Sequence, residues 1–131
     1  MNREMKVTFS NSAKVEALYK GFVIKTDQPV YQGGEGTAPA PFDLFLASIA
    51  TCSAWYVLAF CQKRNIPLEG GSLIQETQRN PETKRIDKII IKVLLPEGFP
   101  EKYKKAVIKS IDGCAVKAHL ENPPAFEVKT S

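Results

Sequence analysis

The sequence predicts an α+β fold in which short strands lie on both sides of one long helix. Two observations lead to this fold class. Apolar and polar residues alternate in short runs, first near the N-terminus and again in the middle of the chain, as they do in half-buried strands. Between these runs, residues 42–64 contain neither proline nor glycine. Strands, a helix, strands and further helices in this order are typical of an α+β domain.

Three alternating runs open the chain, at residues 6–9, 14–19 and 22–25. The pairs Asn11-Ser12 and Lys20-Gly21 separate them and are typical of turns. The sequence therefore predicts an antiparallel meander here. Residues 27–41 follow with three glycines and three prolines, which predicts a loop without regular structure.

Residues 42–64 are apolar around nearly the whole helical circumference, which indicates a buried central helix rather than a surface one. Beyond it, residues 72–78 and 86–95 are predicted strands joined by a polar turn. Residues 101–112 and 115–120 are predicted helices, and residues 126–129 are a predicted final strand.

The length of 131 residues suits a single domain, residues 1–131. The formal charge of +4 comes from scattered lysines and arginines, so we expect no nucleic acid partner. The N-terminus has no apolar leader, and the apolar segment 44–60 is short for a membrane span. We therefore expect a cytoplasmic protein without a membrane partner.

Three cysteines, Cys52, Cys61 and Cys114, are the candidate reactive groups. An odd number argues against a disulfide framework and leaves at least one free thiol. Cys52 is either a nucleophile, which would need a nearby donor or cation, or a small buried hydrophobe. Cys61 lies nine residues further along the helix, on the opposite face, and is interpreted as structural.

Spacing alone leaves the role of Cys114 open, because it could be a core residue or could meet Cys52 across the fold. His119 is the only histidine in the chain, and a single histidine is more often a helix residue than a catalytic base. With one histidine and no paired cysteines, a zinc site is not expected.

Residues 37–52, which run from Thr37 through Pro41 and Asp43 to Cys52, resemble the start of the central helix in the OsmC/Ohr superfamily. Residues 114–120 resemble the second cysteine segment of that family. The resemblance covers essentially the whole chain. It implies an OsmC-like fold and an intertwined homodimer, with active sites at the subunit interface.

The resemblance also implies a thiol peroxidase with Cys52 as the peroxidatic cysteine and Cys114 as the resolving cysteine. Its substrates would be organic hydroperoxides or hydrogen peroxide, and a dithiol or a protein thiol would reduce it. No metal, haem or flavin cofactor is implied. The activity would serve the defence against oxidative stress.

Two positions depart from the family pattern. An arginine from the N-terminal strands would accompany the thiol, but Arg3 is the only arginine before the helix, which leaves Lys14, Lys20 or Lys25 as substitutes. Asp43 is a further candidate site residue, although a carboxylate at this place also stabilises a helix N-terminus. The departures keep an alternative open, namely an OsmC-like dimer without peroxidase activity that binds a small apolar or thiol-reactive ligand.

Overall fold

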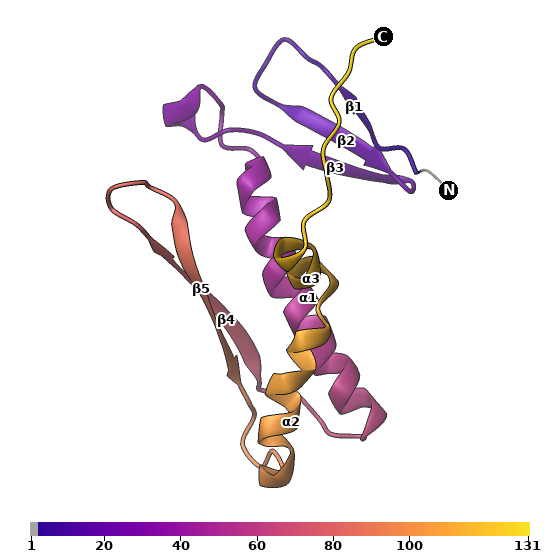
Figure 1. Cartoon of the computed structure of the whole chain (residues 1–131), viewed down its shortest axis with the longest axis vertical. Coiled ribbons are helices and arrows are strands. Elements are labelled where there is room, and N and C mark those ends of the chain that lie inside the picture. The colour runs from indigo at the N-terminus through magenta and orange to yellow at the C-terminus, as the bar shows by residue number, and fades with distance from the viewer. Residues whose placement is uncertain (1–2) are drawn as a thin grey trace. The chain divides into compact units, whose positions relative to one another are not determined.

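The computed structural model describes residues 3–131, which form two compact units, Met1–Ala47 and Ser48–Ser131 (Figure 1). The long helix α1, Pro41–Lys63, begins in the first unit and continues through the second. Helices and antiparallel strands are both present, so the predicted α+β class is confirmed.

The first unit contains the predicted meander. Strands β1 (Lys6–Thr8), β2 (Val15–Tyr19) and β3 (Phe22–Thr26) form an antiparallel sheet in the order β1-β2-β3. Lys20 and Gly21 both have positive φ, as a two-residue hairpin turn requires. The predicted loop is not wholly irregular, because Val30–Gln32 forms one turn of 3-10 helix, η1.

A buried carboxylate organises this loop. Asp27 is 1% exposed, and its two oxygens accept hydrogen bonds from the backbone N–H groups of Gln28, Glu35 and Thr37 and from the Thr37 hydroxyl. These bonds outweigh the effect of burial and lower the pKa of Asp27 to about 2, with the bonds from Thr37 contributing most. At Gly34 a Cβ would lie 1.9 Å from the carbonyl oxygen of Gln28, so the loop closes only with glycine there.

The second unit contains the hydrophobic core. The β4–β5 hairpin, Ser72–Arg79 with Ile86–Leu94, is antiparallel (Figure 1). Its Ile91 and Val93 pack against the core. The buried residues of this core come from α1 and from the segment after the hairpin: Val57, Cys61, Phe99, Val107 and Ile111. Long-range apolar packing of this kind is what holds a small unit together.

The helical C-terminal region is more broken than predicted. Residues 101–113 form η2 (Glu101–Tyr103), α2 (Lys104–Lys109) and η3 (Ser110–Gly113), because both ends tighten into 3-10 turns, as helix ends often do. Helix α3, Ala115–Glu121, follows as predicted. The predicted strand at residues 126–129 is wrong: this segment has no regular structure, and Phe126 is 90% exposed.

Helix α1 buries only one stripe of its surface within the chain. Its buried residues are Ile49, Ser53, Val57 and Cys61, which follow a spacing of four. Other apolar residues of the same helix remain open, such as Trp55, which is 55% exposed. A helix that is apolar all round but covered on one side has a further apolar face without a partner in this chain.

Helix α1 has 23 residues and is longer than the apolar segment 44–60 that the sequence shows. Among the residues described, it is the one helix whose length and composition would allow it to cross a membrane. This is weak evidence for a membrane span, because the core helix of a soluble protein passes the same test.

Candidate functional site

The candidate site lies in the second unit, where the middle of α1 meets the start of α3. Cys114 is fully buried and caps α3, and its Sγ accepts a hydrogen bond from the backbone N–H of Lys117 at 3.5 Å. The half-buried Cys52 thiol is hydrogen-bonded to the Cys114 thiol and to the backbone N–H groups of Ala115 and Val116. The fold therefore brings together two cysteines that are far apart in the sequence.

The surroundings of Cys52 favour its thiolate. Burial is the largest single effect and raises the pKa of Cys52, because a charge is costly away from water. The hydrogen bonds from the Cys114 thiol and from the Val116 and Ala115 amides act the other way. Together they hold the pKa of Cys52 below its ordinary value. A thiol with a lowered pKa carries more of the nucleophilic thiolate at neutral pH.

The geometry at the start of α3 explains why these amides are available. The first N–H groups of a helix have no carbonyl partner within the helix. Ala115 and Val116 are the first two residues of α3, and their N–H groups point to Cys52 instead. The Cys52 thiol thus uses N–H groups that have no partner within α3, so the helix gives up none of its own hydrogen bonds.

Cys61 has a different environment on the same helix. It is 1% exposed and packs in the core with Val57, Val107 and Ile111. Burial raises the pKa of the Cys61 thiol, and the positive charge of Arg64 offsets this only in part. A neutral buried thiol of this kind behaves as a small apolar side chain, as the sequence suggested.

Asp43 and His119 have local partners. Asp43 lies in the first turn of α1, and its carboxylate accepts a hydrogen bond from the backbone N–H of Ala40 at 3.0 Å. That contact supports its interpretation as a helix-stabilising carboxylate. His119 is exposed, and its Nδ1 lies 2.6 Å from the carbonyl oxygen of Ala115. Neither residue is among the groups that set the pKa of Cys52.

Two of the three candidate lysines before α1 also have local partners. Lys14 forms an ion pair with Glu35 at 3.6 Å, and the Lys20 ammonium lies over the Tyr19 ring. The groups that lower the pKa of Cys52 are all donors from residues 114–116. Over the part of the chain described, no cluster of three or more His, Cys, Asp or Glu side chains could hold a metal ion.

Sequence reasoning missed the two backbone amides that accompany Cys52. A backbone donor leaves no residue-type signature, so only the fold could reveal it. The nearest signal was the pair of small residues, Gly113 and Ala115, on either side of Cys114. Small residues there let two backbone segments approach closely.

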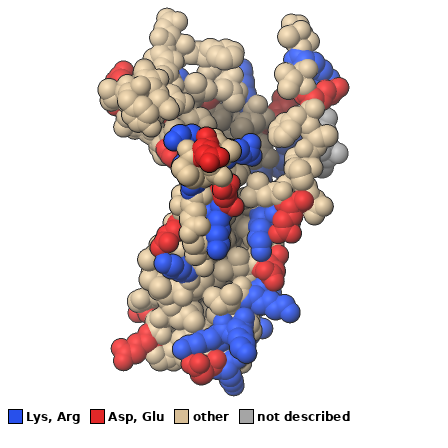
Figure 2. All heavy atoms as spheres, turned by 60° about the vertical axis from the view of Figure 1, so that its left-hand side comes forward, with Lys and Arg blue, Asp and Glu red and all other residues tan. Residues whose placement is uncertain are grey.

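Charged side chains do not form a single-sign surface on the face shown in Figure 2. Basic and acidic residues alternate there, although several basic ones gather at the lower end of the view. Ion pairs link Lys92 to Glu76 at 2.7 Å and Lys117 to Asp112 at 3.4 Å.

Comparison with known proteins identifies the family of the chain. The family model "OsmC-like protein" matches residues 34–129, which include all three cysteines. No curated protein matches the chain.

Solved structures share the fold at low sequence identity. A Psychrobacter arcticus protein described as a putative osmotic stress induced and detoxification response protein has a TM-score of 0.73 at 22% identity, over 90% of this chain and 87% of that chain. A hypothetical protein from Aquifex aeolicus has a TM-score of 0.71 at 21% identity, over 94% and 89%. An organic hydroperoxide resistance protein from Legionella pneumophila has a TM-score of 0.58 at 19% identity, over 92% and 89%.

At these sequence identities the structural neighbours show only the fold and not the function. The family model spans well over half of the chain, and the OsmC-like fold was predicted independently from the two cysteine segments. The chain belongs to the OsmC-like protein family.

Proposed function

We propose that the chain is a thiol peroxidase of the oxidative stress response, with Cys52 attacking the peroxide and Cys114 closing a disulfide. The observation that carries the proposal is the contact between the two thiols, with the Cys52 pKa held below its ordinary value. The family match and the hydroperoxide resistance named for structural neighbours support the same chemistry.

The first step is a two-electron transfer. The Cys52 thiolate attacks the terminal oxygen of a hydroperoxide, so an S–O bond forms and the O–O bond breaks. The sulfur is oxidised to sulfenic acid, which keeps the peroxide proton. The leaving alkoxide takes a proton from water and departs as an alcohol, or as water when the substrate is hydrogen peroxide.

The second step uses Cys114. Its sulfur attacks the Cys52 sulfenic sulfur, the S–S bond forms, and the S–O bond breaks. The leaving hydroxide combines with the Cys114 proton to give water. A dithiol or a protein thiol then reduces the disulfide through two exchange steps and is itself oxidised to a disulfide.

We also propose that the working form is a homodimer in the cytoplasm, with the whole chain acting as one OsmC-like domain. The open face of α1 supports a second copy as its partner, because only the stripe ending in Cys61 is covered within the chain. Large apolar side chains such as Phe22, which is 70% exposed, and Ile74, which is 44% exposed, lie open in both units. A second copy would remove such surfaces from water.

Peroxide consumption with dithiothreitol as the reductant tests this function. An organic hydroperoxide and hydrogen peroxide are compared side by side on the native chain and on Cys52→Ser. We expect turnover that falls by at least about a thousandfold in the variant, because its hydroxyl cannot replace a thiolate. Equal and slow rates in both proteins would contradict the proposal.

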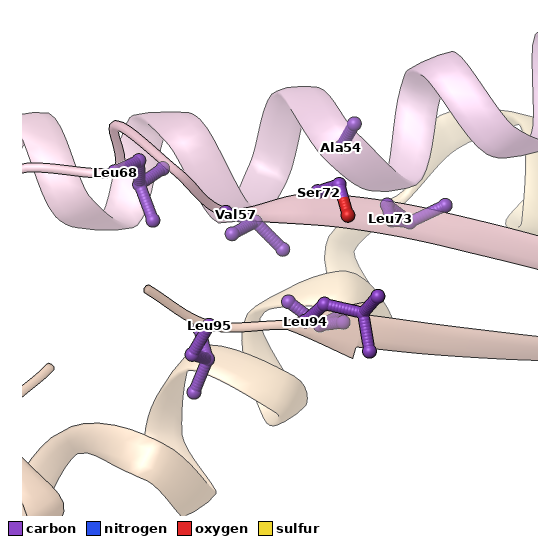
Figure 3. A pocket seen from close by; sticks show the side chains of 9 residues that line it. Ala54, Val57, Leu68, Ser72, Leu73, Leu94 and Leu95 are labelled. Atoms are coloured by element: carbon purple, nitrogen blue, oxygen red, sulfur yellow. The ribbon is translucent and has the colours of Figure 1, made fainter. Parts of the chain in front are cut away.

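A second candidate function is the binding of a small apolar ligand, and one cavity favours it. In the second unit a space of about 130 Å³ lies between α1 and the β4–β5 hairpin (Figure 3). Figure 3 shows its lining from both elements and the segments beside them, including Ala54, Val57, Leu68, Leu73 and Leu95. A cavity near 150 Å³ with such a lining can hold benzene.

This candidate is tested with benzene as the probe. Methyl signals of Val57 and Leu73 should shift and saturate as benzene is added, and Ala54→Leu, which fills the space, should remove the effect. Unshifted methyl signals in the native chain would eliminate the cavity as a binding site. Saturable binding together with slow, unselective oxidation of Cys52 would favour this function over the peroxidase.

A further inference from the structure

A close contact lies one helical turn from the thiol pair. Tyr56 follows Cys52 by four residues, so both lie on the same side of α1. Gly113 directly precedes Cys114 at the end of η3. A Cβ built on Gly113 would lie 2.9 Å from Cε1 and 3.2 Å from Cδ1 of the Tyr56 ring, and real Cβ contacts essentially never fall below 3.0 Å.

The reason for glycine at this position is space and not backbone conformation. Gly113 is absent from the residues with positive φ, so any amino acid could adopt its backbone angles. What excludes a side chain is the edge of the Tyr56 ring. The ring therefore rests directly on the backbone that leads into Cys114.

A second contact joins the same two segments. The Ser110 hydroxyl lies 3.4 Å from the carbonyl oxygen of Tyr56, while also donating to the carbonyl oxygen of Val107. Ser110 and Gly113 are the first and last residues of η3. Tyr56 thus contacts both ends of the short turn that presents Cys114 and the amides of α3 to Cys52.

We propose that the ring-on-glycine contact between Tyr56 and Gly113 positions Cys114 against Cys52 and thereby sets the rate at which their disulfide closes. Tyr56 and Gly113 are positioning residues, because neither touches the reacting sulfur atoms in this role. The inference deepens the proposed peroxidase and takes its physiological meaning from it. Its physical content, the approach of two thiols, is independent of peroxide.

The test measures disulfide closure with diamide, an oxidant that takes two electrons and two protons from a thiol pair and becomes a hydrazine. Gly113→Ala should slow the closure of the Cys52–Cys114 bond by about ten- to a hundredfold, since a displacement near 1 Å can cost this much. Tyr56→Phe keeps the ring edge against Gly113, so the Cys52–Cys114 disulfide should form at the native rate in this variant. Tyr56→Ala removes the ring that rests on Gly113 and should slow closure to an extent similar to that of Gly113→Ala, because Cys114 is then no longer held in place.

Gly71→Ala is the matched control for a crowded glycine. A Cβ there would lie 3.0 Å from the Leu94 carbonyl oxygen and 3.0 Å from Cδ of Pro96, at a place that makes no contact with the thiol pair. It should lower the unfolding temperature and leave disulfide closure unchanged. A general loss of stability would slow closure in both glycine variants, whereas a positioning role slows it in Gly113→Ala alone.

A second readout follows the fate of Cys52 under excess organic hydroperoxide. Slower closure leaves the sulfenic acid exposed for longer, so Gly113→Ala should accumulate Cys52 sulfinic acid, detected by the mass of its peptide. Native closure rates in Gly113→Ala would overturn the inference. A native closure rate in Tyr56→Ala would overturn it too, because the ring would then not be needed to position Cys114. If the native chain forms the Cys52–Cys114 disulfide with diamide but does not react with peroxide, the proposed peroxidase is refuted and the test of the positioning contact still holds.

Discussion

Two cysteines of helix α1, Cys52 and Cys61, have pKa values shifted in opposite directions. Cys52 lies against the start of α3, where donors from residues 114–116 hold its pKa below the ordinary value. Cys61 lies in the apolar core, where burial raises its pKa. Burial acts on both thiols in the same direction. The difference teaches that hydrogen-bond donors, and not burial, separate the thiol with the lowered pKa from the thiol with the raised pKa.

Among the variants that test this comparison, the largest effect is expected from replacing Cys114, the proposed resolving thiol. Cys114→Ser should keep the first oxidation of Cys52 and lose disulfide closure, so dithiol-supported turnover should fall by roughly tenfold or more under excess peroxide. Serine keeps an acceptor for the Lys117 amide, which preserves the cap of α3. The sulfenic acid is trapped with dimedone and measured by mass. Turnover at the native rate would show that Cys114 does not resolve.

The next effect is the contrast in alkylation between Cys52 and Cys61. With iodoacetamide at pH 7, the Cys52 peptide should be modified at least about tenfold faster, because the thiolate is the reacting form. Its pH midpoint should lie below that of an ordinary thiol, and the midpoint for Cys61 above it. In guanidinium chloride the two rates should become equal. Equal midpoints in the folded chain would remove the basis of the comparison.

A smaller effect is expected from Cys61 itself. Cys61→Ala leaves a small gap in the core beside Val57 and Val107 and should cost about 1–2 kcal/mol of the free energy of unfolding. Peroxide consumption should stay within about twofold of the native rate. Urea denaturation measures the first quantity and the dithiol assay the second. A large loss of turnover with the fold intact would assign chemistry to Cys61.

The smallest effect on the thiol chemistry is expected from the first unit. Asp27 has a folded pKa of about 2, below its ordinary 3.8, so its contribution to stability is complete above about pH 4 and is lost as the pH falls toward 2. Asp27→Asn removes acceptors from the loop and should lower the unfolding temperature at pH 7 while reducing this acid sensitivity. The alkylation midpoint of Cys52 should not move.

Glu35→Gln is the control for this loop. Its carboxylate forms an exposed ion pair with Lys14, and such pairs contribute at most about 1 kcal/mol. The backbone N–H of Glu35 that binds Asp27 remains in the variant. An unfolding temperature equally low in both variants would show that the buried carboxylate does not organise the loop.

The sequence predicted elements well where local pattern decides them. Residues 42–64 lack proline and glycine, and the helix found, Pro41–Lys63, differs by one residue at each end. The strand predicted at residues 126–129 failed because alternation needs a neighbouring strand, and Phe126 has none in this chain. The tight turn at Gly34 and the buried Asp27 were missed because a loop rich in glycine was interpreted as irregular.

The candidate site was predictable in part. The small-residue helix marked Cys52, but periodicity cannot bring Cys114 beside it, because that contact depends on how α3 packs on α1. The amides of Ala115 and Val116 carry no sequence signal at all. The missing N-terminal arginine pointed to a substitute cation, whereas the donors found in the structure come from the second cysteine segment.

The most direct measurement is the mass of the cysteine peptides after one equivalent of organic hydroperoxide, with remaining thiols blocked at once by N-ethylmaleimide. The account predicts a disulfide between Cys52 and Cys114, with Cys61 recovered as a blocked thiol. Persistence of the Cys52 and Cys114 thiols, or a disulfide that includes Cys61, would contradict it.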